Sequence, residues 1–481
     1  MVKQQAFLVV DVGTGNVRTA VVSATGEIRS LHRENVHYEK DGDYPDSIAF
    51  HPAQLWEQIK HLAARTLAEA GPVQLTAITA TSQREGVVVL DEAGAPLIGM
   101  SNHDNRGREW ESLITDKDHV YTRTGRYPTA LFSALKLVGL RERKAALWSR
   151  ARAFTSISDW VQYQFSGVLG YEHSQASETL LYDVNAGEWS EALCNVFHLS
   201  PSLLPPLKSS GDVLGTVRSD VAKELGLSPE AIVVVGGADT QLAVHSSKPD
   251  RDDVVIVSGT TTPIIKIVDT YITDDKQRTW TGRHTDAGRF MLEANAGVTG
   301  LNYQRLKEIF YPNEDYGVIE QELDETSYAQ CVASLGSLVA DEETPLTKGG
   351  FIFNAPVSHQ LTRGGFVFAI LWDIACSIYE NYKVLDAVSA HHRDYLLACG
   401  GGVQSRKLRQ FIANLTGKRV RIYNTYRQSS VVGGAFICAE AIGQQGAAPQ
   451  LQEEVVPEDR DRFMELYAEW KRARHTFSQL A

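Results

Sequence analysis

Cysteine is scarce in this chain, and its spacing carries information. The 481 residues include five cysteines, Cys194, Cys331, Cys376, Cys399 and Cys438, which lie far apart. A zinc site or a disulfide framework needs closely and regularly spaced Cys or His residues. The sequence has no CxxC pair and no Cys/His cluster. It therefore predicts free thiols in a reducing compartment and argues against zinc.

Long apolar runs are also missing. No stretch reaches the roughly 18 apolar residues that a membrane-spanning helix requires. The start, MVKQQAFLVVDVGTG, has one lysine and a short apolar segment that ends at Asp11. Such a segment is too short and turns polar too soon for a secretory signal. We therefore expect no membrane association and a cytoplasmic location.

Positive charge is in deficit. Lys and Arg number 47 against 59 Asp and Glu, which gives a net charge of −12 and a pI near 5.7. An acidic chain is a poor candidate for nucleic-acid binding, which relies on basic surfaces. Local pockets for phosphorylated small molecules remain compatible with this charge.

What is present is an alternation of strands and helices. At roughly 100–200 residues per domain, the length predicts two to four domains. Residues 6–11 and 17–22 read as a hairpin, 52–70 as a helix and 77–80 as a buried strand. Later segments alternate in the same way, so the sequence predicts α/β layers. Residues 313–343 read as an acidic, loop-rich stretch, and 457–480 as a charged amphipathic helix.

The opening pattern recurs halfway along the chain. FLVVDVGTGNVRTAVV and VVIVSGTTTPIIKIV both read as strand, Gly-Thr turn and strand. The pairs Gly13-Thr14 and Gly259-Thr260 lie about half the chain apart. An internal repeat at this distance favours two copies of one fold. Because short Gly-Thr hairpins are common, chance recurrence stays open as an alternative.

Three glycine-rich turns follow predicted strands, at residues 13–16, 259–261 and 400–402. Glycine lets backbone N–H groups approach a phosphate, and Thr or Asn adds neutral donors. Each turn alone would be read as a tight turn. Together, in both halves, they suggest a nucleotide held between two lobes. The chain lacks GxxxxGK[ST] and a full GxGxxG after its first strand, which argues against a P-loop and a dinucleotide fold.

Several charged residues stand beside these turns. Asp11 and Asp239 each end an apolar strand next to glycine, where a carboxylate can hold Mg²⁺ or accept a proton. Arg84-Glu85 follows a buried strand, where Arg can donate to sugar hydroxyls and Glu can accept from them. Asp104 and Arg106 offer the same pairing. The alternatives are turn-forming aspartates and ordinary ion pairs.

Taken in order, these motifs resemble the FGGY family of carbohydrate kinases over about residues 7–443. The matching segments are DVGTGNVR (11–18), SQREG (82–86), HDNR (103–106), SISDWVQYQFSG (156–167), SQASETLLYD (174–183), GGADTQ (236–241), SGTTT (258–262), LEANAGVTG (292–300) and ACGGGVQSRKLRQFIANLTGKRV (398–420). The resemblance implies a duplicated, actin-like (ribonuclease H-like) α/β fold with an ATP and sugar cleft between its lobes.

The resemblance also implies residue roles. Asp239 would be the general base, and Asp11 together with Asp239 would help to place Mg²⁺. The remaining assignments fall into three groups. Thr14, Gly15, Asn16, Gly259, Thr260 and Gly300 would face the phosphates of ATP, Gly401 and Ser405 would border the adenosine, and Arg84, Glu85, Asp104 and Gln241 would line the sugar pocket. The implied lobes are 1–246, with the sugar site and base, and 247–445, with the nucleotide site. Residues 446–481 would form a helix that packs back on lobe I.

The substrate is less defined than the reaction. SQREGVVVL, SNHDNRG and SISDW look closest to the autoinducer-2 kinase branch, whose substrate is a small linear polyhydroxy ketone. Gln83-Arg84-Glu85 also resembles the glycerol kinase loop, and a pentulose or another polyol stays open. The segment from Gly350 to Arg363 is shorter than is usual in the family. A homodimer, a non-catalytic actin-fold sugar sensor and, less favoured, an oxidoreductase are further hypotheses.

Overall fold

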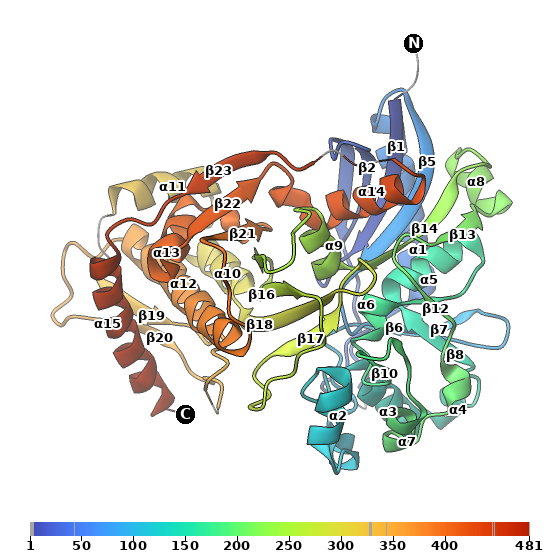
Figure 1. Cartoon of the computed structure of the whole chain (residues 1–481), viewed down its shortest axis with the longest axis horizontal. Coiled ribbons are helices and arrows are strands. Elements are labelled where there is room, and N and C mark those ends of the chain that lie inside the picture. The colour runs from blue at the N-terminus through green and yellow to red at the C-terminus, as the bar shows by residue number, and fades with distance from the viewer. Residues whose placement is uncertain are drawn as a thin grey trace.

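The computed structural model describes residues 4–42, 44–326, 330–342, 344–444, 446 and 448–480. The chain forms two lobes side by side, each built on a mixed β-sheet with helices packed against it (Figure 1). The first half of the sequence makes up lobe I, and most of the second half makes up lobe II.

The lobe I sheet has the strand order β13-β14-β5-β1-β2-β3. The strands β1 (Gln4–Val12), β2 (Asn16–Ser23) and β3 (Ile28–Asn35) form an antiparallel meander that ends at one edge of the sheet. β5 (Val73–Ser82) is parallel to β1, β14 (Ile232–Ala238) is parallel to β5, and β13 (Val213–Thr216) closes the other edge. Residues 6–12 of β1 are buried without interruption, since helices cover both faces of this sheet.

The lobe II sheet repeats this order. β15 (Val254–Val257), β16 (Thr261–Val268) and β18 (Phe290–Val298) form the antiparallel meander. β21 (Tyr395–Cys399) is parallel to β15, and β22 (Arg419–Tyr423) is parallel to β21. β17 (Trp280–Arg283) and β23 (Leu451–Val455) extend the two edges. The shared order confirms the duplication that the two Gly-Thr hairpins predicted.

Helices cover both faces of the lobe I sheet. α1 (Pro52–Glu69) and α5 (Ile157–Ser166) pack on one face. α1 begins at Pro52 and buries Leu55, Ile59 and Leu62, as the spacing of its apolar residues predicted. α9 (Asp239–His245) and α14 (Ser429–Ala441) pack on the other face and on each other.

Helix α14 changes the predicted division into lobes. It lies within the predicted unit 247–445, yet Val431 and Ala435 pack against Phe7 and Val9 of lobe I (Figure 1). The helix is apolar all round and buried over residues 429–439, because α9 and the lobe I sheet enclose it. The second half of the chain therefore completes the first lobe.

The C-terminal helix α15 (Arg460–Ser478) lies on lobe II, and the prediction that it packs back on lobe I is wrong (Figure 1). It contacts β19 (Cys331–Ser334), α12 (Arg363–Val388) and α13 (Arg406–Thr416). Trp470 is 1% exposed and donates to Asp373 at 2.8 Å. Because β23 pairs with β22, the chain stays on lobe II and a short connection leads into α15.

The remaining elements surround the two sheets. In lobe I they are β4 (Ala49–Phe50), β6 (Val87–Leu90), β7 (Pro96–Met100), α2 (Lys117–Thr124), α3 (Ser133–Arg143), α4 (Ala145–Trp148), β8 (Ala153–Ser156), β9 (Tyr171–Glu172), α6 (His173–Ala176), β10 (Tyr182–Asp183), β11 (Glu188–Trp189), α7 (Glu191–Val196), β12 (Leu207–Lys208) and α8 (Ser219–Leu225). In lobe II they are α10 (Gly300–Phe310), α11 (Tyr316–Glu325) and β20 (Gly350–Phe353). The stretch predicted as loop, 313–343, thus contains α11 and β19.

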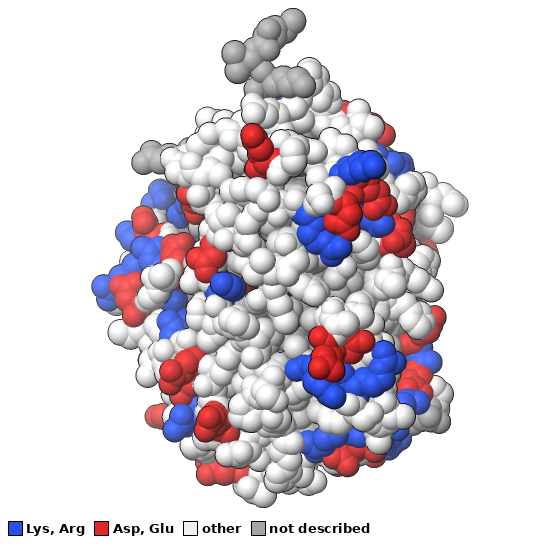
Figure 2. Space-filling view, turned by 90° about the vertical axis from the view of Figure 1, so that its right-hand side faces the viewer, with Lys and Arg blue, Asp and Glu red and all other residues white. Residues whose placement is uncertain are grey.

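The cysteines, the apolar runs and the surface charge can be compared with the composition of the chain. All five cysteines are free and buried, as predicted. Across the described ranges no helix is long and apolar enough to cross a membrane. On the face seen in Figure 2, Lys and Arg lie in small groups beside Asp and Glu.

Candidate active site

The first glycine turn joins β1 to β2 and is held by neighbouring loops. Gly13 N–H donates to the carbonyl of Asn16 at 3.0 Å, which closes the hairpin. Asn102 donates to the Thr14 hydroxyl at 3.0 Å. A Cβ added at Gly15 would meet nothing within 4 Å. The backbone at the tip of this hairpin is thus fixed in position and open to a ligand.

Asp11 ends β1 just before this turn and is fully buried. Its Oδ2 accepts from Arg18 at 2.5 Å and from the Ser430 hydroxyl at 2.7 Å. Its Oδ1 is buried and has no hydrogen-bond partner among the described residues. One carboxylate oxygen therefore remains for an additional ligand.

Asp239 begins α9 at the end of β14, where lobe I meets lobe II. Its Oδ1 accepts from the backbone N–H of Thr240 at 2.6 Å and from the Thr240 hydroxyl at 3.2 Å. Burial, and secondarily the charge of Asp11, raise the pKa of Asp239 to about 6, although Arg84 works in the opposite direction. A carboxylate with this pKa is ionised at neutral pH and is a stronger base than an ordinary aspartate.

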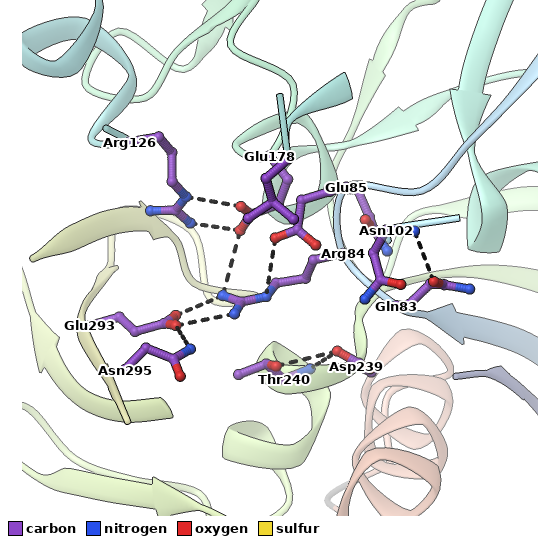
Figure 3. A network of polar contacts seen from close by, with 12 residues as sticks. Gln83, Arg84, Glu85, Asn102, Arg126, Glu178, Asp239, Thr240, Glu293 and Asn295 are labelled. Carbon is purple, nitrogen blue, oxygen red and sulfur yellow. Dashed lines mark hydrogen bonds and ion pairs between the residues drawn. The ribbon is translucent and has the colours of Figure 1, made fainter. Parts of the chain in front are cut away.

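Arg84 lies at the centre of the polar network in Figure 3. It follows β5, and its guanidinium makes a two-point contact with Glu293 of β18, at 2.6 and 3.1 Å. Its Nη1 lies 3.7 Å from Glu178, and its Nε lies 3.9 Å from Glu85. The Arg84–Glu293 pair joins the two lobes beside Asp239.

Glu85, next along the loop, is 6% exposed and has a backbone φ of 60°. A non-glycine residue in this region is uncommon, and strained residues of this kind tend to cluster at functional sites. Burial raises the pKa of its carboxyl group, and the nearby Arg84 lowers it. The strained backbone directs a buried acidic group toward the Arg84 network (Figure 3).

The second glycine turn lies between β15 and β16, against the start of α10. The N–H groups of Thr299 and Leu301 both donate to the carbonyl of Thr260, at 3.2 and 3.3 Å. A Cβ at Gly300 would lie 2.1 Å from the carbonyl oxygen of Gly259, so only glycine fits there. A Cβ at Gly259 itself would meet only Thr261 O, at 3.7 Å. The structure thus brings Gly259, Thr260 and Gly300 together.

The third glycine turn follows β21 and precedes α13. Gly402 N–H donates to the carbonyl of Ser258 at 2.9 Å, which packs this turn against the second hairpin. Gly401 faces open space, because a Cβ there would meet only Gln404 Nε2 at 3.9 Å. Ser405 caps α13 by accepting from the N–H of Leu408. The Gly259 and Gly401 turns are therefore neighbours in lobe II.

Two predicted sugar-site residues have a different environment from the one expected. Asp104 is fully buried, accepts from Arg106 at 2.9 and 2.8 Å, and accepts from the N–H of Ile48 at 2.8 Å. Its carboxylate is occupied in holding its own loop, so direct contact with a sugar stays a prediction. Gln241 is 1% exposed on α9, and its Oε1 lacks a partner among the described residues.

Sequence reasoning missed the charged residues that hold Arg84. Glu178 lies in the segment SQASETLLYD, to which no site role was assigned, and it forms a two-point contact with Arg126 at 2.9 and 2.6 Å. Glu293 lies in the lobe that was predicted to hold the nucleotide. A signal was available, since Glu293 interrupts the apolar strand FMLEANAGV. A carboxylate in such a run is buried only when a cation accompanies it.

The donor set suits a magnesium–nucleotide complex. Mg²⁺ in phosphoryl-transfer sites is usually bound by one or two carboxylates, with waters and phosphates completing the shell. Asp11 offers an unpartnered buried oxygen, and the backbone is open at Gly15, Gly259 and Gly401. Among the described residues no group of three or more His, Cys, Asp or Glu could hold a metal by itself. A metal here would depend on the phosphates for its remaining ligands.

Comparisons with known proteins agree with this geometry. The model of the FGGY family of carbohydrate kinases, N-terminal domain, matches residues 6–245, and the C-terminal domain model matches residues 342–442. Bacillus subtilis (strain 168) YoaC, provisionally named a sugar kinase, is 49% identical over 99% of this chain and 98% of its own length.

Two further proteins are more distant. The autoinducer-2 kinase of Escherichia coli (strain K12) is 26% identical over 91% of this chain and 85% of its own length. The ligand-bound xylulose kinase of Lactobacillus acidophilus has the same fold, with a TM-score of 0.85 and 16% identity over 98% of each chain. The structural match agrees with the two-lobe arrangement of the sheets. The chain belongs to the FGGY family of carbohydrate kinases and is a sugar kinase of the two-lobe, actin-like fold.

Proposed function

We propose that this kinase transfers the γ-phosphoryl group of ATP to a primary hydroxyl of a small ketose or polyol, with Asp239 as general base. The main supporting observation is the position of Asp239. It stands at the lobe junction, beside Arg84 and near Asp11, with its pKa raised to about 6. A base near 6 takes a proton from an alcohol in the transition state and is still ionised at neutral pH.

The other predicted site residues would bind the substrate, the nucleotide and the metal ion. The substrate hydroxyls would be oriented by Arg84, Glu85 and Gln241, which would bring one hydroxyl within reach of Asp239. The backbone at Gly15, Gly259 and Thr260 would line the phosphates, and Gly401 and Ser405 would border the adenosine. Mg²⁺, held by Asp11 with help from Asp239, would neutralise phosphate charge when the nucleotide is bound.

Closure of the lobes would protect the reaction from water. Arg84 in lobe I and Glu293 in lobe II are in direct contact, which supports a site formed by both lobes. Excluding water matters because water would compete with the sugar hydroxyl for the phosphoryl group.

For the substrate we propose a linear polyhydroxy ketone resembling autoinducer-2, or a pentulose. One relative is an autoinducer-2 kinase at 26% identity, and the SQREG, HDNR and SISDW segments favour the same branch. Glycerol or another polyol is the second candidate, because Gln83-Arg84-Glu85 resembles the glycerol kinase loop. A cytoplasmic location and a homodimer stay predictions.

An ADP-release screen tests this proposal directly. Purified protein with ATP and Mg²⁺ is offered pentuloses, hexuloses, polyols, aldonates and the linear autoinducer precursor, with water alone as the blank. We expect sugar-dependent ADP release that is lost when EDTA removes Mg²⁺. Hydrolysis of ATP at the same rate with and without every sugar would contradict the proposal.

A further inference from the structure

Both guanidinium groups of the Arg84 network are already neutralised by protein carboxylates. Arg84 makes its two-point contact with Glu293, and Arg126 makes its own with Glu178. A third N–H of Arg126 faces the carbonyl of Gly125 at 3.4 Å. The geometry of both contacts is the one in which guanidinium and carboxylate bind most strongly. The guanidinium edges that form these two contacts are therefore not available to a second carboxylate.

The lysine nearest to this network is occupied as well. Lys136 is fully buried and donates to the backbone carbonyls of Asn102 and Leu131. Burial lowers its pKa, although the charges of Glu85 and Asp104 oppose this shift, so its charge faces protein carboxyl groups. The chain therefore supplies no spare cation at this point from Arg84, Arg126 or Lys136.

Carboxyl groups outnumber the guanidinium groups in Figure 3. Arg84 and Arg126 face Glu85, Glu178, Glu293 and Asp239. Even with Glu85 protonated, because burial raises its pKa, more carboxylates than guanidinium groups remain. Each guanidinium charge of the network is therefore matched by a protein carboxylate before any substrate binds.

The unpartnered hydrogen-bond acceptors of the site also favour an uncharged substrate that carries hydroxyl donors. Gln241 Oε1 and Asn102 Oδ1 are buried oxygens that have no partner within the described part of the chain. Each is an acceptor and needs a donor. Sugar hydroxyls can donate to such atoms, whereas an ionised carboxylate accepts only.

From these observations we infer that the site selects uncharged polyhydroxy substrates and rejects sugar acids, and that Glu293 of lobe II sets this selectivity by neutralising Arg84. The inference rests on the proposed sugar site. It goes beyond the proposed function because it names the exclusion of sugar acids and a specificity residue that lies in lobe II.

Glu293 acts from the second lobe, together with Trp280. Trp280 of β17 lies under both guanidinium groups, at 5.9 Å from Arg84 and 5.3 Å from Arg126. Asn295 donates to Glu293 at 2.9 Å and fixes its carboxylate. The selectivity is therefore complete only when lobe II lies against lobe I.

Matched substrate pairs test the inference on the unmodified protein. Each pair differs by one change from CH₂OH to carboxylate: xylitol and xylonate, glucitol and gluconate, glycerol and glycerate. Xylulose, ribulose and the linear autoinducer precursor serve as neutral ketoses. We expect phosphorylation of at least one neutral compound and at least about a hundredfold lower kcat/KM for every aldonate. An aldonate turned over as well as the best neutral compound overturns the inference and leaves the kinase function intact. No turnover of any compound overturns the proposed function, and this inference with it.

The variant Glu293→Gln tests the named residue. It keeps the shape and the hydrogen bond but frees the charge of Arg84. We expect the inhibition constant of gluconate or xylonate against the best neutral substrate to fall at least tenfold, as a new charge-assisted hydrogen bond would produce. The inhibition constant of a neutral competitor should change less. Equal changes for neutral and acidic competitors would contradict the role of Glu293.

Glu454→Gln is the matched control. Glu454 lies on β23 and pairs with two arginines, Arg419 at 3.0 Å and Arg421 at 2.6 Å, so the same chemical change is made away from the site. It should leave both inhibition constants unchanged. The thermal midpoint of each variant shows whether it is folded. The wild-type pairs decide the inference even if Glu293→Gln does not fold.

Discussion

The ends of β5 and β21 occupy the same topological position in the two lobes, yet they carry opposite chemistry. Each strand is parallel to the first strand of its own meander. The end of β5 leads into Gln83-Arg84-Glu85, with a buried ionic network. The end of β21 leads into Gly400-Gly401-Gly402, with no side chains at all. One fold thus provides two kinds of binding site.

The first hairpins differ in the same way. Two residues before Gly13 stands Asp11, and two residues before Gly259 stands Val257. Lobe I carries Asp11 and Asp239 beside its glycine turn, and in the proposed site it would contact the substrate through side chains. The glycine turns of lobe II would approach the nucleotide with bare backbone. A polyhydroxy substrate requires directed donors and acceptors, whereas a nucleotide requires close approach of amides, and the duplicated scaffold serves both.

Removing the base should have the largest effect. In Asp239→Asn the side chain keeps its size but cannot accept the proton, so kcat should fall at least about 10²-fold while ATP binding is retained. Steady-state kinetics and nucleotide binding by calorimetry measure the two quantities. Near-normal turnover would exclude Asp239 as the base and remove the main chemical difference between the lobes.

Removing the Arg84 side chain after β5 of lobe I should weaken sugar binding. Arg84→Ala removes the charged donor, and the sugar KM should rise roughly 10–100-fold, more than the ATP KM. The change also leaves Glu178 and Glu293 short of a cation, which should cost about 3 kcal/mol of stability. Kinetics measured below the lowered thermal midpoint separate the two effects. A larger rise in the ATP KM would place Arg84 outside the sugar site.

Adding a side chain in the glycine turn after β21 of lobe II should weaken nucleotide binding rather than sugar binding. Gly401 has space for a side chain, so Gly401→Val should fold and raise the ATP KM about tenfold, with the sugar KM nearly unchanged. Gly400→Ala is the contrasting variant. Gly400 has φ 95°, and a Cβ there would lie 2.4 Å from the carbonyl of Ser258, so the main result should be a lower thermal midpoint. An unchanged ATP KM in Gly401→Val would contradict the assigned nucleotide side.

The contribution of the lobe junction to protein stability should depend on pH. His245 of α9 contacts Glu440 of α14 at 3.1 Å and lies 3.6 Å from Asp286. His284 also faces it. Burial disfavours the imidazolium, but the two carboxylates raise the pKa of His245 to about 9. Because the folded pKa lies above the ordinary value near 6.5, this stabilisation is complete below pH 6.5 and is lost as the pH rises toward 9.

His245→Gln should therefore flatten the pH dependence of stability. The shift corresponds to about 2 kcal/mol once the partial exposure of both carboxylates is allowed for. Urea unfolding at pH 6 and pH 9 measures the difference for wild type and variant. His475→Gln, at an exposed position on α15, is the control. Parallel pH profiles for wild type and His245→Gln would contradict the contribution of this junction.

Motifs that combine a turn with a preceding strand were predicted well. The hairpins at Gly13 and Gly259 appear where the local sequence placed them, and so does helix α1, because turn chemistry and apolar spacing act over a few residues. The partners of Arg84 could not be predicted. Glu178 and Glu293 lie 94 and 209 residues away in sequence, so only the packing of the lobes brings them to Arg84. α15 was assigned to the wrong lobe for the same reason.

The sequence alone determined the family, the duplicated α/β fold and the identity of the glycine turns, since each depends on short-range patterns of residue type. The tertiary structure decided which charges meet. It paired Asp104 with Arg106 and placed α14 on the lobe I sheet. It also paired Arg84 with Glu293, a carboxylate from lobe II. Buried charges require partners, and a partner is selected by three-dimensional proximity, which local sequence does not encode.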